Sequence, residues 1–186
     1  MTNAIVTGSL SAIAHRDDKS IAETFISADI VVIVDTSGSM CAKDSRGGNT
    51  RYQIACEELA MLQSSLPGKI AVIAFSDTTI FCPSGIPFYF GGNTNLAGAL
   101  TFAKVADVPG MRFIVISDGE PDDEEATLRV ARSYKNRIDV IYVGPEDRPH
   151  GRSFLERLAS ASGGIVATAD RAKELAPTIE KLLLKG

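Results

Sequence analysis

Residues 29–40 read DIVVIVDTSGSM, where a short apolar run ends at Asp35. A run this short and this rich in β-branched residues is typical of a strand buried on both faces of a parallel sheet. Similar runs follow at 69–76, 112–117, 138–144 and 164–169. A weaker run, TTIFC at 78–82, follows too closely for a crossover helix. We therefore expect it to form an antiparallel hairpin at the sheet edge.

The segments between these runs have helical patterns. They lie at 51–66, 94–106, 121–136, 151–162 and 172–185. The helix at 121–136 is expected to begin at Pro121, because proline and the acids after it suit a helix N-terminus. Alternating strands and helices predict an α/β fold: a three-layer, doubly wound, Rossmann-like and mostly parallel sheet with one antiparallel edge strand and helices on both faces. Residues 1–20 are interpreted as an N-terminal extension of a domain at 21–186.

The composition excludes several classes of function. The 186 residues are 45% apolar and 23% charged, with a net charge of −4 and no basic stripe, so we expect no nucleic-acid partner. No apolar run approaches the roughly 20 residues that span a bilayer, so we expect no membrane insertion. The N-terminus lacks a basic segment before its apolar part, and Cys41, Cys56 and Cys82 lack metal-type spacing. These features predict a cytoplasmic protein with reduced thiols, although a longer precursor could carry an export signal.

Oxygen-bearing side chains gather at the predicted carboxyl ends of the strands, where ligands bind in such folds. The candidate residues are Asp35, Ser37, Ser39, Thr94 and Asp118. Hard oxygen ligands favour Mg²⁺, Mn²⁺ or Ca²⁺, and short side chains favour the smaller ions. Two carboxylates would balance a divalent cation, and neutral hydroxyls would leave it electrophilic towards an outside carboxylate. We therefore predict a Mg²⁺ site that could also take Mn²⁺ or Ca²⁺.

Simpler interpretations of the same residues remain open. Ser37 and Ser39 could merely cap a turn or helix. The acids at 122–125 could be a second metal site or a solvated first turn of a helix. Three consecutive aromatic residues at 88–90 could flank the metal and touch a partner, or pack under a long loop. Cys41 could be redox-active or a passive thiol.

Three motifs together carry a resemblance to a known family. DTSGSM, GGNTNL and ISDGEPDD, in this order, resemble the von Willebrand factor A (VWA) domain family over residues 27–184. The family implies a metal-ion-dependent adhesion site (MIDAS) on the sheet edge, formed here by the five candidate residues named above. Asn93 separates the usual glycine pair from Thr94, which is a small departure from the family pattern. In the family, a Glu or Asp of a partner protein commonly completes the metal coordination.

The expected function is therefore a metal-dependent protein-binding module rather than an enzyme. Intracellular members of the family are often accessory or scaffold subunits, which makes an AAA-class ATPase system one expected partner. A related possibility is a conformational switch in which the helix at 172–185 shifts when ligand binds. The alternative is a Mg²⁺-dependent phosphotransferase or phosphatase with Asp35 as nucleophile. That chemistry usually needs a second acid two residues later, where this chain has Ser37.

Overall fold

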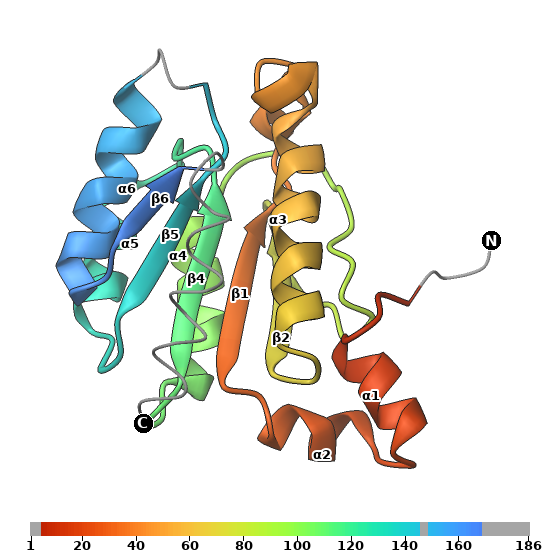
Figure 1. The fold of residues 1–186 in the computed structure, drawn as a ribbon. Helices are drawn as coiled ribbons and strands as arrows, with labels where there is room; N and C mark the ends of the chain where they lie inside the picture. Colours follow the sequence, from red (N-terminus) through yellow and green to blue (C-terminus); the bar gives the residue numbers. More distant parts are fainter. Residues whose placement is uncertain (1–4, 146–148, 169–186) are drawn as a thin grey trace.

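A six-stranded sheet forms the centre of the computed structural model, which describes residues 5–145 and 149–168 (Figure 1). The strands are β1 (Ile30–Asp35), β2 (Ile70–Phe75), β3 (Thr79–Phe81), β4 (Arg112–Ser117), β5 (Ile138–Tyr142) and β6 (Val166–Thr168). They lie in the order β3-β2-β1-β4-β5-β6. Neighbouring strands are parallel, except that β3 is antiparallel to β2. The mostly parallel sheet with one antiparallel edge strand is thus confirmed.

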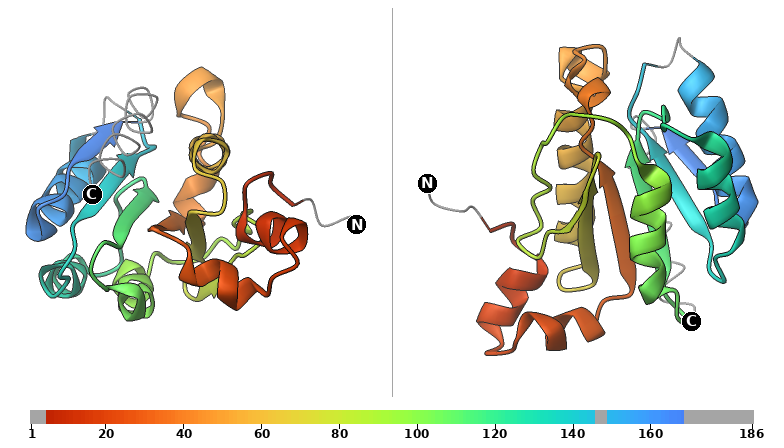
Figure 2. Two further views of the ribbon diagram at one scale, coloured as in Figure 1. Left: turned by 60° about the horizontal axis from the view of Figure 1, so that its bottom comes forward. Right: turned by 180° about the vertical axis from the view of Figure 1, so that it is seen from behind.

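Helices cover both faces of this sheet (Figures 1 and 2). The described helices are α1 (Leu10–Arg16), α2 (Ile21–Ile26), α3 (Arg51–Ser65), α4 (Leu96–Ala103), α5 (Glu124–Arg132), α6 (Pro149–Ser162) and the short 3₁₀ helices η1 (Gly38–Cys41), η2 (Arg46–Gly48) and η3 (Lys104–Ala106). Side chains of β1 alternate between the faces: Val32 belongs to the core under α3, and Ile33 to the core under α4, α5 and α6. The three-layer α/β architecture predicted from the sequence is confirmed.

A capping box fixes the start of α3. The Thr50 hydroxyl accepts a hydrogen bond of 3.1 Å from the Gln53 N–H, and the Gln53 side chain accepts one of 2.8 Å from the Thr50 N–H. Two backbone donors that the first turn would leave unpaired are thereby satisfied. The consequence is that Arg51 stands at the first helical position, beside the carboxyl ends of β1 and β4.

Three helical predictions differ from the structure or lie outside it. Helix α5 begins at Glu124 and not at Pro121, because Asp123 is its N-cap and accepts a hydrogen bond of 2.8 Å from the Ala126 N–H. The helix predicted at 94–106 is divided into α4 and η3. The helix predicted at 172–185, with the conformational switch assigned to it, lies outside the described residues.

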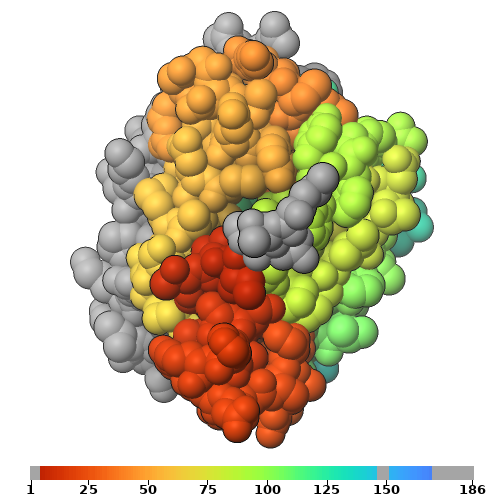
Figure 3. Space-filling view, turned by 90° about the vertical axis from the view of Figure 1, so that its right-hand side faces the viewer, coloured from red at the N-terminus to blue at the C-terminus, as the bar shows by residue number. Residues whose placement is uncertain are grey.

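Residues 5–20 pack against the rest of the domain (Figure 3). Leu10 of α1 is 1% exposed and joins the core on the α4 side of the sheet. The Gly68 N–H donates to the Gly8 carbonyl over 2.8 Å, and the Ser11 N–H donates to the Pro83 carbonyl over 2.9 Å. The sequence pattern did not predict α1, and the boundary at residue 20 stays a prediction. Within 5–145 and 149–168, none of the helices combines the length and apolarity that crossing a membrane requires.

Candidate metal centre

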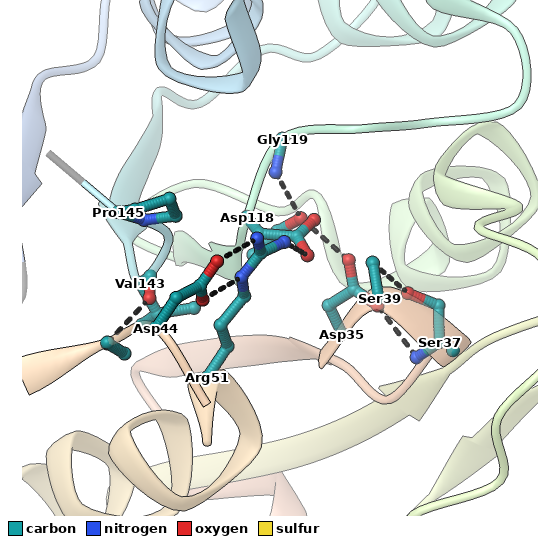
Figure 4. Close-up of polar contacts among 12 residues, drawn as sticks. Asp35, Ser37, Ser39, Asp44, Arg51, Asp118, Gly119, Val143 and Pro145 are labelled. Atoms are coloured by element: carbon teal, nitrogen blue, oxygen red, sulfur yellow. Dashed lines mark hydrogen bonds and ion pairs between the residues drawn. The ribbon is translucent and has the colours of Figure 1, made fainter. Parts of the chain in front are cut away.

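The candidate centre lies where β1 and β4 end side by side. β1 ends at Asp35 and β4 at Ser117, and Val34 pairs with Ile116 in parallel register. Parallel neighbours present their carboxyl ends at one edge of the sheet, so Asp118 reaches the same place as Asp35 (Figure 4). Asp35 is 0% exposed and Asp118 2%. The structure therefore brings the two predicted carboxylates together in a buried setting.

The loop after β1 folds back on Asp35. The Ser37 N–H donates a hydrogen bond of 2.9 Å to Asp35 Oδ1, as in an Asx turn. The hydroxyl oxygens of Ser37 and Ser39 lie 3.3 Å apart. Ser37 is the N-cap of η1, yet its side chain makes no capping hydrogen bond. Helix capping thus does not explain the serines, and the turn groups one carboxylate with two hydroxyls.

Ser117 joins β4 to this loop and was missed in the sequence. Its hydroxyl donates a hydrogen bond of 2.7 Å to Asp35 Oδ2 and accepts one of 3.0 Å from the Gly119 N–H. Ser117 is 1% exposed, so solvent does not compete for these bonds. The available signal was a small hydroxyl residue at the end of an apolar strand, directly before a predicted ligand. Ser117 orients Asp35 from the neighbouring strand.

The glycine-rich loop before α4 is tied to the loop after β1. The Gly38 N–H donates to the Gly92 carbonyl, and the Gly91 N–H donates to the Thr36 carbonyl, each over 2.9 Å. Gly92 has φ of +85°, and a Cβ there would lie 2.0 Å from an oxygen of Asp77. A side chain at this position would meet both backbone strain and a clash. Glycine therefore allows the two loops to lie together.

Thr94 is held at the same end of the sheet by its backbone. The Thr94 N–H donates a hydrogen bond of 2.9 Å to Asp122 Oδ1, and the Asp122 N–H donates one of 3.1 Å to the Thr94 carbonyl. The Asn95 N–H donates to the Ser76 carbonyl, beyond the end of β2. Asp122, one of the acids considered for a second metal site, thus holds the Thr94 loop. Asp123 is a helix cap, which favours the structural interpretation of that acidic stretch.

Arg51 contacts Asp118 and was also missed in the sequence. Its Nη1 lies 2.6 Å from Asp118 Oδ2, and its Nε and Nη2 lie 2.9 and 2.8 Å from the two oxygens of Asp44 (Figure 4). Hydrogen bonding to Asp44 is the largest cause that raises the Arg51 pKa above its usual range, so the guanidinium stays charged. Asp118 Oδ1, in contrast, is buried without a hydrogen-bond partner among the described residues.

Burial dominates the electrostatics of Asp35. Removal from water is the largest cause and the negative charge of Asp118 the next, and the pKa of this carboxyl is raised from 3.8 to about 6. Hydrogen bonds from Ser37 and Ser117 favour the charged form and partly oppose this rise. Two buried carboxylates at one edge favour a cation between them, because its positive charge stabilises their ionised forms.

The residues present fit a hard divalent cation. Asp118 Oδ1 is a buried acceptor with no partner among the residues that the structure describes, and a cation would satisfy it. The Asp35 carboxylate keeps lone pairs beyond the hydrogen bonds that it accepts from Ser37 and Ser117. The neighbouring hydroxyls of Ser37 and Ser39 add neutral oxygen donors. Over the described ranges no three His, Cys, Asp or Glu side chains gather around one point as metal ligands would. The donors at this edge are carboxylates and hydroxyls, which are oxygen ligands of the kind that Mg²⁺ prefers.

Aromatic side chains lie exposed on the loop that borders this centre. Phe88, Tyr89 and Phe90 are 54%, 43% and 44% exposed. The Tyr89 hydroxyl lies 3.4 Å from the Gly38 carbonyl, which it can reach as a donor, and its ring packs edge-on against Tyr52. The loop therefore leaves apolar surface open beside the site instead of burying it. Cys41, at the end of η1, is exposed and reduced.

The fold has solved counterparts. An aerotolerance-related membrane protein from Bacteroides fragilis superposes with a TM-score of 0.63 and 18% identity, over 84% of this chain and 98% of that one. The manganese-loaded TRAP protein of Plasmodium vivax gives 0.58 and 18%, over 78% and 70% of the two chains. A von Willebrand factor type A protein from Catenulispora acidiphila gives 0.56 and 18%, over 81% and 41%.

These similarities identify the architecture as the VWA fold, as the sequence motifs predicted. They do so at identities too low to carry a function or a ligand across. No protein-family profile and no curated protein sequence matches the chain.

Proposed function

We propose that this protein is a metal-dependent protein-binding module. Asp35, Ser37, Ser39, Thr94 and Asp118 would hold a Mg²⁺ ion, or Mn²⁺ or Ca²⁺ in its place. When bound, the cation supplies a Lewis-acidic position that an acidic side chain of a partner protein can occupy. The observation that carries the proposal is the buried Asp118 Oδ1, which has no hydrogen-bond partner within residues 5–145 and 149–168, beside the buried Asp35. An acceptor in that state costs free energy unless a ligand satisfies it.

Two further observations support a cation at this edge. Ser37 and Ser39 bring two hydroxyl oxygens within 3.3 Å of each other next to Asp35, without a capping role. The similarly folded TRAP protein was solved loaded with manganese. Neutral hydroxyl ligands would leave the cation with more net positive charge than an all-carboxylate site would. Such a site suits binding of a Glu or Asp from a partner.

The neighbouring loops would contact the rest of the partner surface. Phe88, Tyr89 and Phe90 present exposed rings beside the site, and aromatic side chains are enriched at the centres of protein interfaces. The partner is therefore expected to place apolar groups around its acidic residue. An AAA-class ATPase system served by this chain as an accessory or scaffold subunit, in the cytoplasm, remains the proposed setting.

The phosphotransferase alternative has less support. An aspartyl nucleophile is usually accompanied by a second acid two residues later, and this chain has Ser37 there, whose N–H instead donates to Asp35. Arg51, a side chain that could hold a phosphate, is engaged by Asp44 and Asp118. Turnover of p-nitrophenyl phosphate by the wild type, lost in Asp35→Asn, would favour this alternative over the binding module.

Partner capture tests the proposal. Immobilised wild-type protein should retain a partner in Mn²⁺ or Mg²⁺ and release it in EDTA, and Asp118→Ala should retain none in either buffer. Neutralising one Glu or Asp of the captured partner should abolish binding as completely as Asp118→Ala does. Equal capture by the Asp118→Ala variant, with the fold intact by circular dichroism, would contradict the proposal.

A further inference from the structure

Arg51 is a buried cation in an electrostatically unfavourable place. It stands at the first position of α3, held there by the Thr50 capping box, and is 5% exposed. The N-terminus of a helix carries partial positive charge, so a guanidinium there is disfavoured by the helix itself. Burial of the charge adds a desolvation cost. Helix propensity therefore does not explain why an arginine stands at this position, and the explanation has to lie in the contacts of its side chain.

Those contacts divide the guanidinium between two carboxylates. One edge of the fork reaches both oxygens of Asp44, at 2.9 and 2.8 Å. The remaining Nη1 reaches Asp118 Oδ2 at 2.6 Å, a short charge-assisted hydrogen bond between two buried groups. Asp44 is 31% exposed and anchors the guanidinium from the solvent side. Asp44 thus orients Arg51, and the remaining Nη1 of Arg51 donates a hydrogen bond to Asp118.

The bond to Arg51 uses only one oxygen of Asp118. Oδ2 is paired, whereas Oδ1 is buried and has no hydrogen-bond partner in the described part of the chain. A guanidinium that blocked the site would occupy both oxygens, since bidentate pairing is the usual Arg–carboxylate geometry. Here it neutralises the carboxylate and leaves one oxygen available.

We propose that Arg51 is the resident countercharge of Asp118, which lets the edge stay folded without a metal ion and lowers its affinity for one. Without Arg51, Asp118 would be an uncompensated buried charge next to Asp35, a situation that strongly destabilises a fold. With Arg51 present, an incoming dication meets a fixed positive charge nearby and a carboxylate that is already half neutralised. The stability part stands on the contacts alone, whereas the affinity part rests on the proposed metal-binding function.

A double-mutant cycle in EDTA tests the stability part. Arg51→Gln should lower Tm by about 10 °C, because a buried pair loses one partner. The double variant Arg51→Gln/Asp118→Asn should recover most of that loss, because the orphaned charge is gone. Arg51→Lys keeps the charge but loses the fork, so its Tm should fall less than that of Arg51→Gln. If the decrease in Tm of the double variant equalled the sum of the decreases in the two single variants, the proposal would be overturned.

Titration of the same proteins with Mn²⁺ tests the affinity part. Arg51→Gln should bind Mn²⁺ about tenfold more tightly than wild type, and its Tm should rise more on Mn²⁺ addition. Arg137→Gln is the matched control. The Nε of Arg137 lies 3.3 Å from Oδ2 of the buried Asp139, and this pair is remote from the proposed metal site. Its Mn²⁺ affinity should equal that of wild type. Weaker Mn²⁺ binding by Arg51→Gln would overturn the affinity part and make Arg51 a residue that assists the metal.

The two measurements separate failure of this inference from failure of the proposed function. Wild-type protein that binds no Mn²⁺, with coupling between Arg51 and Asp118 still present in EDTA, would reject the metal site and keep Arg51 as countercharge. Wild-type protein that binds Mn²⁺ without such coupling would keep the metal site and reject the role of Arg51. If Arg51→Gln folds only when Mn²⁺ is present, the metal replaces the guanidinium, as the proposal requires.

Discussion

The Ser117 hydroxyl donates a hydrogen bond of 2.7 Å to Asp35 Oδ2, and so joins the ends of β4 and β1 inside the candidate metal centre. The same hydroxyl accepts from the Gly119 N–H, which fixes the direction in which it donates. Asp35 is thereby held from the neighbouring strand as well as by its own loop. The orientation of Asp35 is a property of the sheet and not of the Asp-x-Ser-x-Ser motif alone.

Ser117→Ala should weaken metal binding without unfolding the domain. Loss of a hydrogen bond that orients a ligand typically costs about 10-fold or more in metal affinity. Titration calorimetry with Mn²⁺ measures this directly. Ser76→Ala is the matched control, because Ser76 is also buried, beyond the end of the neighbouring strand β2. Equal affinities for wild type and Ser117→Ala would show that the Asp35 loop needs no support from β4.

Gly119→Ala should destabilise the protein more than an ordinary loop glycine substitution. A Cβ at Gly119 would lie 2.1 Å from the Gly151 carbonyl oxygen, and φ is +83°. Gly110 shares the strain, with φ of +87°, but a Cβ there meets nothing within 4 Å. Urea denaturation should give a loss of about 1 kcal/mol for Gly110→Ala and roughly 3 kcal/mol for Gly119→Ala. Similar losses in the two variants would contradict the close approach of the Gly119 loop to α6.

Leu10→Ala should reveal whether the N-terminal helices are part of the folding unit. Leu10 is 1% exposed and packs in the core, so its truncation should cost about 3 kcal/mol. Ile26 of α2 is 82% exposed, and Ile26→Ala should change stability by no more than about 0.5 kcal/mol. The stabilities of the two variants can be compared by monitoring their thermal unfolding with circular dichroism. An unaffected Leu10→Ala variant would support an independent extension that ends near residue 20.

Metal-free protein should lose stability as the pH rises from about 4 to about 6. Burial and then Asp118 raise the pKa of Asp35 to about 6, so in this window the folded state holds a proton that the unfolded state releases. Folding is therefore disfavoured by rising pH, by at most about 3 kcal/mol for a shift of this size. Denaturant titrations in EDTA across this range measure it. Asp35→Asn lacks the group and should lack this part of the pH dependence.

Much of the fold could be predicted because its strands are short, apolar and buried on both faces. β4 spans Arg112–Ser117, as the pattern of its residues predicted, and β3 forms the expected hairpin with β2. Helix starts were less predictable, because several acidic residues compete for the cap. Asp123 caps α5, whereas Asp122 binds the Thr94 loop, and only the tertiary structure decides between them.

At the candidate centre, the residues that follow a strand directly could be predicted, and their partners could not. Asp35 and Asp118 are placed by the parallel register of β1 and β4, which the apolar runs imply. Ser117 and Arg51 act through contacts that join residues 82 and 67 positions apart. No local pattern encodes such pairs. A basic residue directly after a helix cap was the one available signal for Arg51.

The most direct test of the account is calorimetric titration of Mg²⁺ and Mn²⁺ into metal-stripped wild-type protein and into Asp118→Asn, with folding of both checked by circular dichroism. The account predicts about one ion bound per wild-type chain, because the proposed ligands belong to a single site, and no binding by the variant. A wild-type protein that binds neither ion, or a variant that binds as well as wild type, would contradict the existence of a metal site at this edge of the sheet.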